Sequence, residues 1–331
     1  MTYRVQMLEP STSFDIEAGE SVLTAALRAG VGLAHSCQLG GCGTCRIRLL
    51  EGEVEYEEQP LGLDDEDREA GYALACQAHA LGDLVIESAR DEHCAEPLRH
   101  WATVSSVVQL SPDVAHLSLV IPEIDALTYR PGQHLKLHAP DGRSRSFSMA
   151  SVPRQNMVDL HIRRVPGGWF TDGWMPGLKP GDRIEVELPL GNFFYRAADY
   201  RPLIMIATGT GLAPIKSILE SLMDDPDCPP VSLYWGGRQT ADLYLGEQIA
   251  SWGERLYDFQ YIPVLSRPQA GWAGRCGYVQ DAVAADLGDL AEHAIYLCGS
   301  PTMIQGARNR FIGLGASTAH IYMDSFTFQS T

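Results

Sequence analysis

Residues 35–45 read HSCQLGGCGTC and place three of the chain's eight cysteines in one short loop. A disulfide framework is a poor explanation, because such frameworks are typical of short secreted chains that lack a large core. This chain has 331 residues, and its start, MTYRVQMLEP, has neither the basic region nor the long apolar run of a secretory signal. No stretch approaches the roughly 18 apolar residues of a membrane span. We therefore expect a cytoplasmic protein without membrane association, whose reduced cysteines bind metal or act in catalysis.

The spacing of these cysteines is Cys-x4-Cys-x2-Cys, and Cys76 follows after 30 intervening residues. This is the plant-type spacing of a 2Fe-2S cluster, in which four thiolates converge on two irons. A zinc site is the main alternative, but it usually needs two Cys-x2-Cys pairs or a mixture of cysteine and histidine. No second pair lies near Cys76, and His79 is interpreted as a surface residue although it and His35 flank the loop. The predicted cluster ligands are Cys37, Cys42, Cys45 and Cys76.

The surroundings of the loop agree with this prediction. Its three glycines allow the backbone to curl around a cluster, because glycine tolerates positive φ and close approach. SFDIEAGE begins as a strand, Ser21 can cap a helix that ends at Gly30, and CRIRLLEGEVEY and LGDLVIES supply further strands. Residues 1–92 therefore resemble a plant-type ferredoxin, which implies a small β-grasp sheet with one packed helix.

Charge is unevenly distributed along the chain. The formal net charge is −17, which argues against a nucleic-acid partner because phosphate binding needs Lys and Arg. Residues 1–92 hold 18 acidic residues against 6 arginines and no lysine, so this segment carries −12 and the remainder −5. An acidic N-terminal domain can dock a basic partner, although plain solubility explains the charge equally well.

The pattern changes after residues 93–101, which are interpreted as a linker. Six short runs separated by turn residues then favour a small antiparallel β-barrel over residues 102–199. From residue 200 to 331, strands alternate with helices, which indicates a doubly wound parallel sheet covered by helices. The predicted strands of this last domain lie near 203–207, 231–235, 260–265, 294–298 and 320–323, and its helices near 213–223, 278–287 and 302–314.

The barrel and the α/β domain together resemble the ferredoxin–NADP reductase superfamily. The flavin motif of that superfamily, Arg-x-Tyr-Ser-x-x-Ser, is matched by RSFSMAS, residues 145–151. The resemblance implies that Arg145 binds the FAD pyrophosphate as a charged donor, that Phe147 lies against the isoalloxazine, and that the Ser148 hydroxyl lies near flavin N5. Because Phe147 replaces the commoner tyrosine, a phenolic hydrogen bond is lost while the stacking face is kept.

Two further segments complete the FAD site that the resemblance implies. The strand HIR runs beside the ribityl and adenine parts, and VPGGWFT offers backbone N–H groups at a helix start, which can bind phosphate. An ordinary turn is the alternative for these glycines. The additional predicted FAD-binding residues are Ser146, His161, Ile162, Arg163, Gly167, Gly168 and Thr171.

The nicotinamide nucleotide is expected at three turns of the α/β domain. GTGLAP follows a strand and opens a helix, but Pro214 replaces the third glycine of the dinucleotide fingerprint. YWGGR and CGSP lie at the carboxyl ends of later strands, where open α/β sheets bind ligands. The resemblance implies that Thr210 approaches both nucleotide and flavin, and that Cys298 approaches the nicotinamide in a positioning role. The predicted residues are Gly209, Thr210, Gly211, Pro214, Gly236, Arg238, Cys298, Gly299, Pro301 and Met303.

Two alternatives stay open at this end of the chain. Cys298 is also explained as a small buried hydrophobic residue. In many members of the superfamily a C-terminal aromatic residue covers the flavin, and Phe326 is our choice over Phe328, although either ring can simply pack. The predicted catalytic set is Ser148, Cys298 and Phe326.

As a whole, the chain resembles the three-domain reductase components of Rieske-type multicomponent oxygenases, of the benzoate dioxygenase reductase type. The resemblance implies a monomeric NAD(P)H oxidoreductase that passes electrons from NAD(P)H to FAD, then to 2Fe-2S, and then to the terminal component of an aromatic-ring oxygenase. NADH is favoured by the habit of such reductases, although Arg238 is compatible with NADPH and Asp242 lies close to it in sequence.

Two other functions are consistent with the same motifs. A different acceptor, either a di-iron monooxygenase hydroxylase or a dehydratase that deoxygenates a nucleotide sugar, would leave the cofactors unchanged. A passive electron carrier or an iron–sulfur interaction protein would have an inactive nucleotide domain, and the intact GTGLAP and CGSP turns argue against it.

Overall fold

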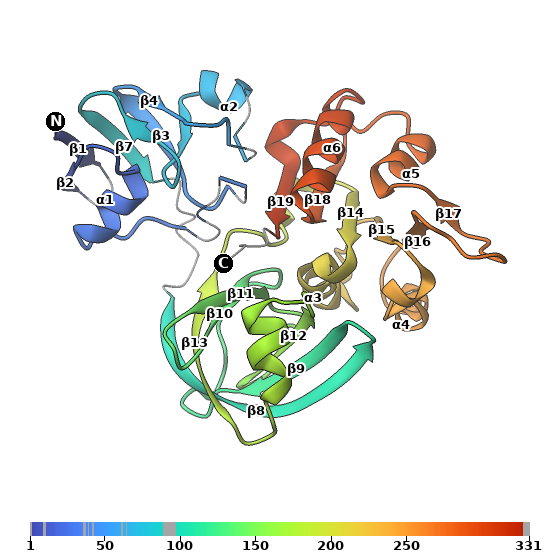
Figure 1. Cartoon of the computed structure of the whole chain (residues 1–331). Helices are drawn as coiled ribbons and strands as arrows, with labels where there is room; N and C mark the ends of the chain where they lie inside the picture. The colour runs from blue at the N-terminus through green and yellow to red at the C-terminus, as the bar shows by residue number, and fades with distance from the viewer. Residues whose placement is uncertain are drawn as a thin grey trace. The chain divides into compact units, whose positions relative to one another are not determined.

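The computed structural model describes residues 2–8, 11–35, 38, 40–41, 43–60, 62–63, 65–88 and 97–326 (Figure 1). The chain forms two compact units: unit 1 comprises residues 1–94 and 323–331, and unit 2 comprises residues 95–322. Within the described ranges, no helix has the length and apolar character needed to cross a membrane.

Unit 1 is built on a five-stranded mixed sheet. Its order is β2-β1-β7-β3-β5, with β1 and β7 parallel and the other neighbours antiparallel. The strands alternate buried and exposed residues, so Val5 and Met7 of β1 and Phe14 and Ile16 of β2 face one core. The sheet strands are β1 (Tyr3–Met7), β2 (Thr12–Ile16), β3 (Arg46–Glu51), β5 (Tyr72–Leu74) and β7 (Leu84–Ser88); β4 (Val54–Glu55) pairs with β6 (His79–Ala80), and the helices are α1 (Val22–Arg28) and α2 (Asp65–Glu69). The predicted ferredoxin-type sheet with its packed helix is confirmed.

Helix α1 fixes the turn that carries Cys76. The Ser21 hydroxyl accepts from the Thr24 N–H at 3.2 Å and caps the helix. The first N–H groups of a helix have no partner within the helix. In α1, the N–H groups of Val22 and Leu23 donate to the carbonyls of Ala78 and Ala75 in the Cys76 turn, at 2.9 and 2.8 Å. The start of α1 and the backbone on both sides of Cys76 therefore form one hydrogen-bonded element.

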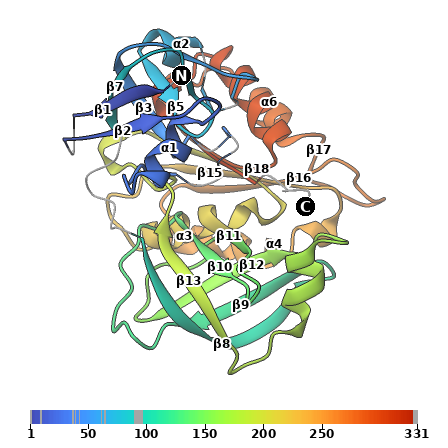
Figure 2. The same ribbon diagram turned by 60° about the vertical axis from the view of Figure 1, so that its left-hand side comes forward.

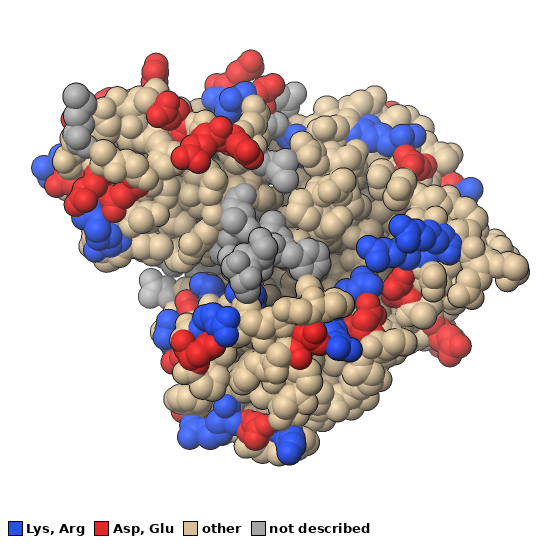
Figure 3. Space-filling view, viewed as in Figure 1, with Lys and Arg blue, Asp and Glu red and all other residues tan. Residues whose placement is uncertain are grey.

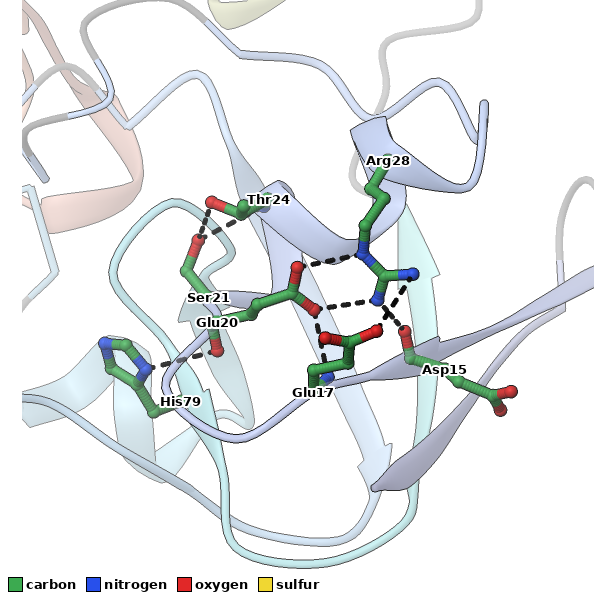
Figure 4. A network of polar contacts seen from close by, with 7 residues as sticks. All are labelled: Asp15, Glu17, Glu20, Ser21, Thr24, Arg28 and His79. Carbon is green, nitrogen blue, oxygen red and sulfur yellow. Dashed lines mark hydrogen bonds and ion pairs between the residues drawn. The ribbon is translucent and has the colours of Figure 1, made fainter. Parts of the chain in front are cut away.

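A polar network holds the same helix at its other side (Figure 4). The Arg28 guanidinium donates to both carboxylate oxygens of Glu20, at 2.9 and 2.8 Å, and to the Asp15 carbonyl at 2.8 Å. His79 Nδ1 lies 3.2 Å from the Glu20 carbonyl oxygen, which connects β6 to the same network. Thus α1, β2 and β6 are joined around the cysteine turn.

Unit 2 begins with a six-stranded antiparallel barrel, whose strands can be followed in Figure 2. Its strand order is β11-β10-β13-β8-β9-β12, and a bridge between Met149 and Leu160 joins β11 to β12, which closes the sheet on itself. The predicted barrel is therefore confirmed, and β8 already begins inside the segment predicted as a linker. Its strands are β8 (Leu98–Ser111), β9 (Val114–Val120), β10 (His134–His138), β11 (Ser144–Ser148), β12 (Met157–Arg163) and β13 (Arg183–Leu190).

The second sheet of unit 2 has the order β17-β16-β15-β14-β18-β19, and its assigned registers are parallel. The chain returns to the middle of the sheet between β14 and β18, which is a topological switch point, where such folds bind ligands. The doubly wound prediction is confirmed. Its strands are β14 (Leu203–Thr208), β15 (Val231–Gly237), β16 (Phe259–Leu265), β17 (Arg275–Cys276), β18 (Ala294–Gly299) and β19 (Ile321–Ser325); its helices are α3 (Leu212–Leu222), α4 (Gly246–Ala250), α5 (Val279–Asp286) and α6 (Pro301–Ile312).

The last strand has a distinctive position in this division. β19 is the edge strand of the second sheet, yet its residues from Met323 onward are counted in unit 1. Asp324 and Ser325 are both buried. The C-terminal segment is therefore part of the unit that contains the cysteine loop.

The cap of α1 generates a test. Replacing Ser21 with Ala removes the capping acceptor, and we expect α1 to lose about 1 kcal/mol of stability. Hydrogen–deuterium exchange of peptides that cover α1 should then be about fivefold faster than in the unchanged protein. Ser21→Asp keeps an acceptor and should exchange at the original rate; faster exchange in that variant as well would show that the cap is not the cause.

Candidate functional site

The described cysteines of the predicted cluster site lie close in the backbone network of unit 1. Cys45 and Cys76 are buried, with 3% and 7% of their surface exposed. The N–H of Ala75 donates to the Cys45 carbonyl at 2.9 Å, which joins the end of the loop to the Cys76 turn. Cys37 and Cys42 lie outside the described residues. Across the ranges that the structure describes, no group of three or more metal-ligating side chains occurs.

The glycines give the loop a compact path. Gly40 and Gly43 have φ of +70° and +69°, a region that L side chains rarely adopt. A Cβ at Gly40 would lie 2.8 Å from the Pro60 side chain, and the Gly40 carbonyl accepts from the Gly62 N–H at 2.7 Å. Two buried cysteine side chains beside this tight loop fit a 2Fe-2S group, because cysteine thiolates are the ligands of such clusters.

The predicted flavin motif lies on β11. Ser148 is buried opposite His134 of β10, and the Phe147 ring is 5.3 Å from that of Phe170. The guanidinium of Arg145 lies 4.8 Å from the Trp169 ring centroid, while Ser146 is exposed. The motif therefore combines a partly buried cation, an aromatic face and a buried hydroxyl.

Arg145 is placed to receive an anion. Desolvation, and then the nearby charge of Arg143, lowers the pKa of Arg145. Both guanidinium groups lie over Trp169, Arg143 at 3.9 Å and Arg145 at 4.8 Å from the ring centroid. A pyrophosphate bound here would offset the repulsion between two cations on one ring, so these residues fit the phosphate part of FAD.

The loop before the helical turn Trp169–Trp174 contains a feature that sequence reasoning missed. Thr171 Oγ1 accepts from the Val165 N–H at 2.9 Å, and the Asp172 carboxylate accepts from the Gly167 N–H at 2.7 Å. This hydrogen bond, followed by the one from Arg164, lowers the pKa of Asp172. Since Gly167 already has a carboxylate acceptor, a phosphate at this donor would replace Asp172; a role for Gly168 and Thr171 at phosphate stays a prediction.

Two turns meet at the switch point of the second sheet. Gly209–Gly211 form a tight turn between β14 and α3, and Pro214 lies in the first turn of α3. A Cβ at Gly211 would lie 2.3 Å from the Cys298 carbonyl oxygen, and one at Gly299 would lie 2.1 Å from Thr208 Oγ1. These glycines are therefore required for close packing between the two turns. Cys298 is fully buried, and Ser300 caps α6, with Pro301 in its first turn and Met303 nearly buried.

Residues predicted from the barrel and from the second sheet meet in unit 2. His161 Nδ1 lies 3.2 Å from the Tyr244 hydroxyl, and the buried Ile162 precedes Arg163 in β12. Arg163 forms ion pairs with Asp113 and Asp242, at 2.6 and 3.3 Å.

The end of β15 contributes to the same region. Asp242 accepts from the N–H of Arg238 at 2.7 Å, and the Trp235 indole donates to the Gly209 carbonyl at 3.0 Å. A Cβ at Gly236 would lie 2.6 Å from the Val279 side chain, so this position also needs glycine. The Arg238 side chain is exposed.

A buried lysine and its neighbouring serine connect α3 to the barrel. Lys216 donates to the Ala150 carbonyl at 2.7 Å and to Glu220 at 2.8 Å, and its side chain is 11% exposed. The Ser217 hydroxyl donates to the Ser151 carbonyl at 2.5 Å, and Tyr129 donates to the same oxygen at 2.8 Å. The segment that follows Ser148 is thus fixed to the helix that follows Gly211.

Phe326 is half-buried and belongs to the part of the chain counted in unit 1. Its predicted place over the flavin stays a prediction, and Phe328 lies outside the described residues. Thr210 lies within the tight turn before α3 and is half-buried.

Family models match three successive parts of the chain. A 2Fe-2S iron-sulfur cluster binding domain matches residues 7–81, an oxidoreductase FAD-binding domain 101–195, and an oxidoreductase NAD-binding domain 205–309. The chain is 35% identical to the reductase component 1 of terephthalate 1,2-dioxygenase from Comamonas sp, over 100% of this chain and 99% of that protein.

Two further proteins are similar over nearly the whole chain. The reductase of CDP-6-deoxy-L-threo-D-glycero-4-hexulose-3-dehydrase from Yersinia pestis is 33% identical, over 98% of this chain and 99% of that one. The crystal structure of a cytochrome P450 reductase from Amycolatopsis matches with a TM-score of 0.75 and 34% identity, over 98% of both chains.

The Lys216–Glu220 pair generates a test of packing within unit 2. Lys216→Met leaves the Glu220 carboxylate, whose side chain is only 13% exposed, without its ion-pair partner, so we expect a loss of about 3 kcal/mol in the free energy of unfolding. The double variant Lys216→Met with Glu220→Met should recover much of that loss, because no charge is left buried. All six tryptophans lie in unit 2, so urea unfolding followed by tryptophan fluorescence measures it. Equal losses in the single and double variants would contradict a coupled pair.

His161 generates a pH dependence. Burial, followed by the charge of Lys216, lowers the pKa of His161 to about 3. As pH falls below about 6.5, the unfolded chain binds a proton at this histidine that the native protein refuses, so stability is lost between pH 6.5 and 3, by up to about 1.4 kcal/mol per pH unit. In His161→Asn this slope should be smaller by that amount, measured by the same tryptophan fluorescence at pH 6, 5 and 4. A slope equal to that of the unchanged protein would contradict a neutral buried imidazole.

Proposed function

Because the chain belongs to the family of oxidoreductases that join 2Fe-2S, FAD-binding and NAD-binding domains, we propose that it delivers electrons from NADH to the terminal component of a multicomponent aromatic-ring oxygenase. The observation that supports this most is the order of the three domains, together with 35% identity to a dioxygenase reductase along essentially the full length of both chains. The proposed division is ferredoxin-type domain 1–92, linker 93–101, FAD-binding barrel 102–199 and NAD-binding domain 200–331.

The cofactors divide the chemistry. When bound, FAD accepts the two electrons of a hydride and gives them up singly, and the 2Fe-2S cluster carries one electron at a time. We propose that Cys37, Cys42, Cys45 and Cys76 hold the cluster, which the burial of the two described thiols supports. The protein's task is then to bind these groups, orient them and exclude water.

The proposed FAD site uses the charge and shape of the barrel. Arg145 would hold the pyrophosphate, because its charge is partly desolvated and lies beside Arg143. Phe147 would offer its face to the ring system, and the buried Ser148 hydroxyl would orient it. The low pKa of His161, about 3, keeps this imidazole neutral at pH 7, so it would act as a hydrogen-bonding partner and add no charge beside the cofactor.

The proposed nucleotide site uses the two turns at the switch point. The Gly209–Gly211 turn would lie against the nucleotide, and Cys298 would be a positioning residue, since it is fully buried directly against Gly211. Lys216 would keep this turn aligned with the flavin strand, because it ties α3 to Ala150. We propose NADH as the donor, with Asp242 in the helical turn that follows β15, where an acidic group favours a free ribose hydroxyl.

We propose further that the protein acts as a monomer and that the oxygenase docks on unit 1. Figure 3 shows Asp and Glu side chains over the visible face of this unit, where few Lys and Arg lie between them. Residues 1–92 carry a net charge of −12, so a basic partner surface would be attracted and the rate of association would fall with salt.

A second acceptor is favoured by a specific observation. The reductase of a CDP-sugar dehydrase is 33% identical over 98% of this chain, so a nucleotide-sugar dehydratase is the alternative partner. Purified components distinguish the two acceptors. NADH-dependent product formation with an aromatic-ring dioxygenase supports the proposal, whereas turnover with the dehydratase alone contradicts it.

The electron path generates a prediction. NADH added without air should bleach first the flavin absorption and then that of the cluster. Cys42→Ser should still reduce ferricyanide at the original rate, while its reduction of cytochrome c falls at least about tenfold, because one-electron transfer outward needs the cluster. Cys276→Ser, at an exposed cysteine without an assigned role, is the matched control. Undiminished reduction of cytochrome c by Cys42→Ser, or a spectrum that NADH does not change, would contradict the proposed path.

A further inference from the structure

Ser325 is a buried hydroxyl without a partner, and it lies in the same unit as the cysteine loop. It is the last residue of β19, and only 7% of its surface is exposed. Among the described residues, its Oγ has no hydrogen-bond partner. A buried hydroxyl that makes no hydrogen bond is costly, so native structures usually provide an acceptor for it.

The neighbour of this hydroxyl is the loop proposed to hold the cluster. A Cβ added to Gly41 would lie 3.5 Å from Ser325 Oγ and 3.6 Å from Ser325 Cβ. Gly41 is buried and directly precedes Cys42 in the sequence. These are ordinary contact distances, so Ser325 lies directly beside the backbone of the loop at Gly41.

The backbone carbonyls near Gly41 do not accept a hydrogen bond from the Ser325 hydroxyl. The carbonyl oxygens of Gly40 and Gly41 both lie 3.1 Å from the position of a Cβ on Gly62, and the first accepts from the Gly62 N–H at 2.7 Å. Neither receives a hydrogen bond from Ser325. The acceptors that a cysteine-ligated cluster would add at this loop are sulfur atoms, both cysteinyl and bridging.

We infer that Ser325 donates a hydrogen bond to a sulfur atom of the 2Fe-2S group and thereby raises its reduction potential. This inference rests on the proposed ligation of that group by the cysteine loop. Reduction adds negative charge to the sulfurs, so a donor stabilises the reduced form more than the oxidised form. Partners beyond the ligands themselves commonly tune metal centres in this way. Ser325 would thus be a positioning and tuning residue, supplied by the C-terminal segment.

The test compares four full-length proteins: the unchanged chain, Ser325→Ala, Ser325→Thr and Ser317→Ala. Ser317 is the matched control, because it lies shortly before β19 and its hydroxyl makes no capping hydrogen bond. Potentiometric titration of the electron paramagnetic resonance signal gives the potential of the 2Fe-2S group in each. In Ser325→Ala we expect the ratio of reduced to oxidised form at a given potential to fall threefold to tenfold, and tenfold corresponds to about 59 mV for a one-electron couple. Ser325→Thr keeps the donor and should restore the original ratio.

A second readout reports the hydrogen bond itself. Resonance Raman spectra of the iron–sulfur stretching modes, recorded in H2O and D2O, should show an isotope shift in the unchanged protein that is smaller in Ser325→Ala and present in Ser317→Ala. A merely structural role for Ser325 would not change this shift. The flavin potential should be the same in all four proteins, which shows that only the iron–sulfur site has responded.

The outcomes separate this inference from the proposed function. If the unchanged protein contains no iron–sulfur signal, the proposed function fails. If Ser325→Ala holds a full complement of iron and shows the original potential and isotope shift, the inference is overturned while the function stands. If Ser325→Ala fails to retain iron, Ser325→Cys decides, because its thiol is a weaker donor of nearly the same shape: a partly lowered potential supports the inference, and an unchanged one overturns it.

Discussion

The arrangement of the barrel and α3 in unit 2 depends on the hydrogen bonds that the ammonium group of Lys216 donates. This group is nearly buried, and a buried charge is tolerated only when it is paired and fully hydrogen-bonded. Here its partners are the Glu220 carboxylate, one turn along the same helix, and the Ala150 carbonyl, which directly follows the Met149 bridge that closes the barrel. These hydrogen bonds hold α3 at a fixed distance from the segment that follows β11 and ends the flavin motif. Hydride transfer between two bound cofactors requires such fixed positions.

Glycine residues allow a second kind of contact, in which two backbone segments pack directly against each other. Gly211 lies against the Cys298 carbonyl, and Gly299 lies against Thr208, so two carboxyl-terminal turns of adjacent strands come together without side chains between them. In unit 1 the glycines of the cysteine loop have the same function beside Pro60 and Gly62. At both sites, glycine therefore lets neighbouring backbone segments pack more closely than side chains would allow.

The features of the fold and of the candidate site that the sequence predicted are those that depend on residues close together in the chain. The helix cap at Ser21 and the alternating strands are local patterns that predicted the correct elements, and the cysteine spacing predicted the 2Fe-2S domain that the family model matches. The contacts of Lys216 with Ala150 and of His161 with Tyr244 join residues 66 and 83 positions apart, and no local pattern encodes them. The capture of the Gly167 N–H by Asp172 was also missed, since an acidic residue near a glycine turn has no single meaning until the backbone path is known.

The placement of the end of β19 has a consequence for how such proteins are assembled from modules. The compact unit that contains the N-terminal ferredoxin-type sheet also includes the final residues of the chain, Met323 onward. If the N-terminal segment were exchanged between two related chains, it would be combined with a C-terminal segment from the other protein. That segment would have evolved beside a different cysteine loop. Recombination at the apparent linker would not separate independent parts, so the first and last segments of the chain are expected to be inherited together.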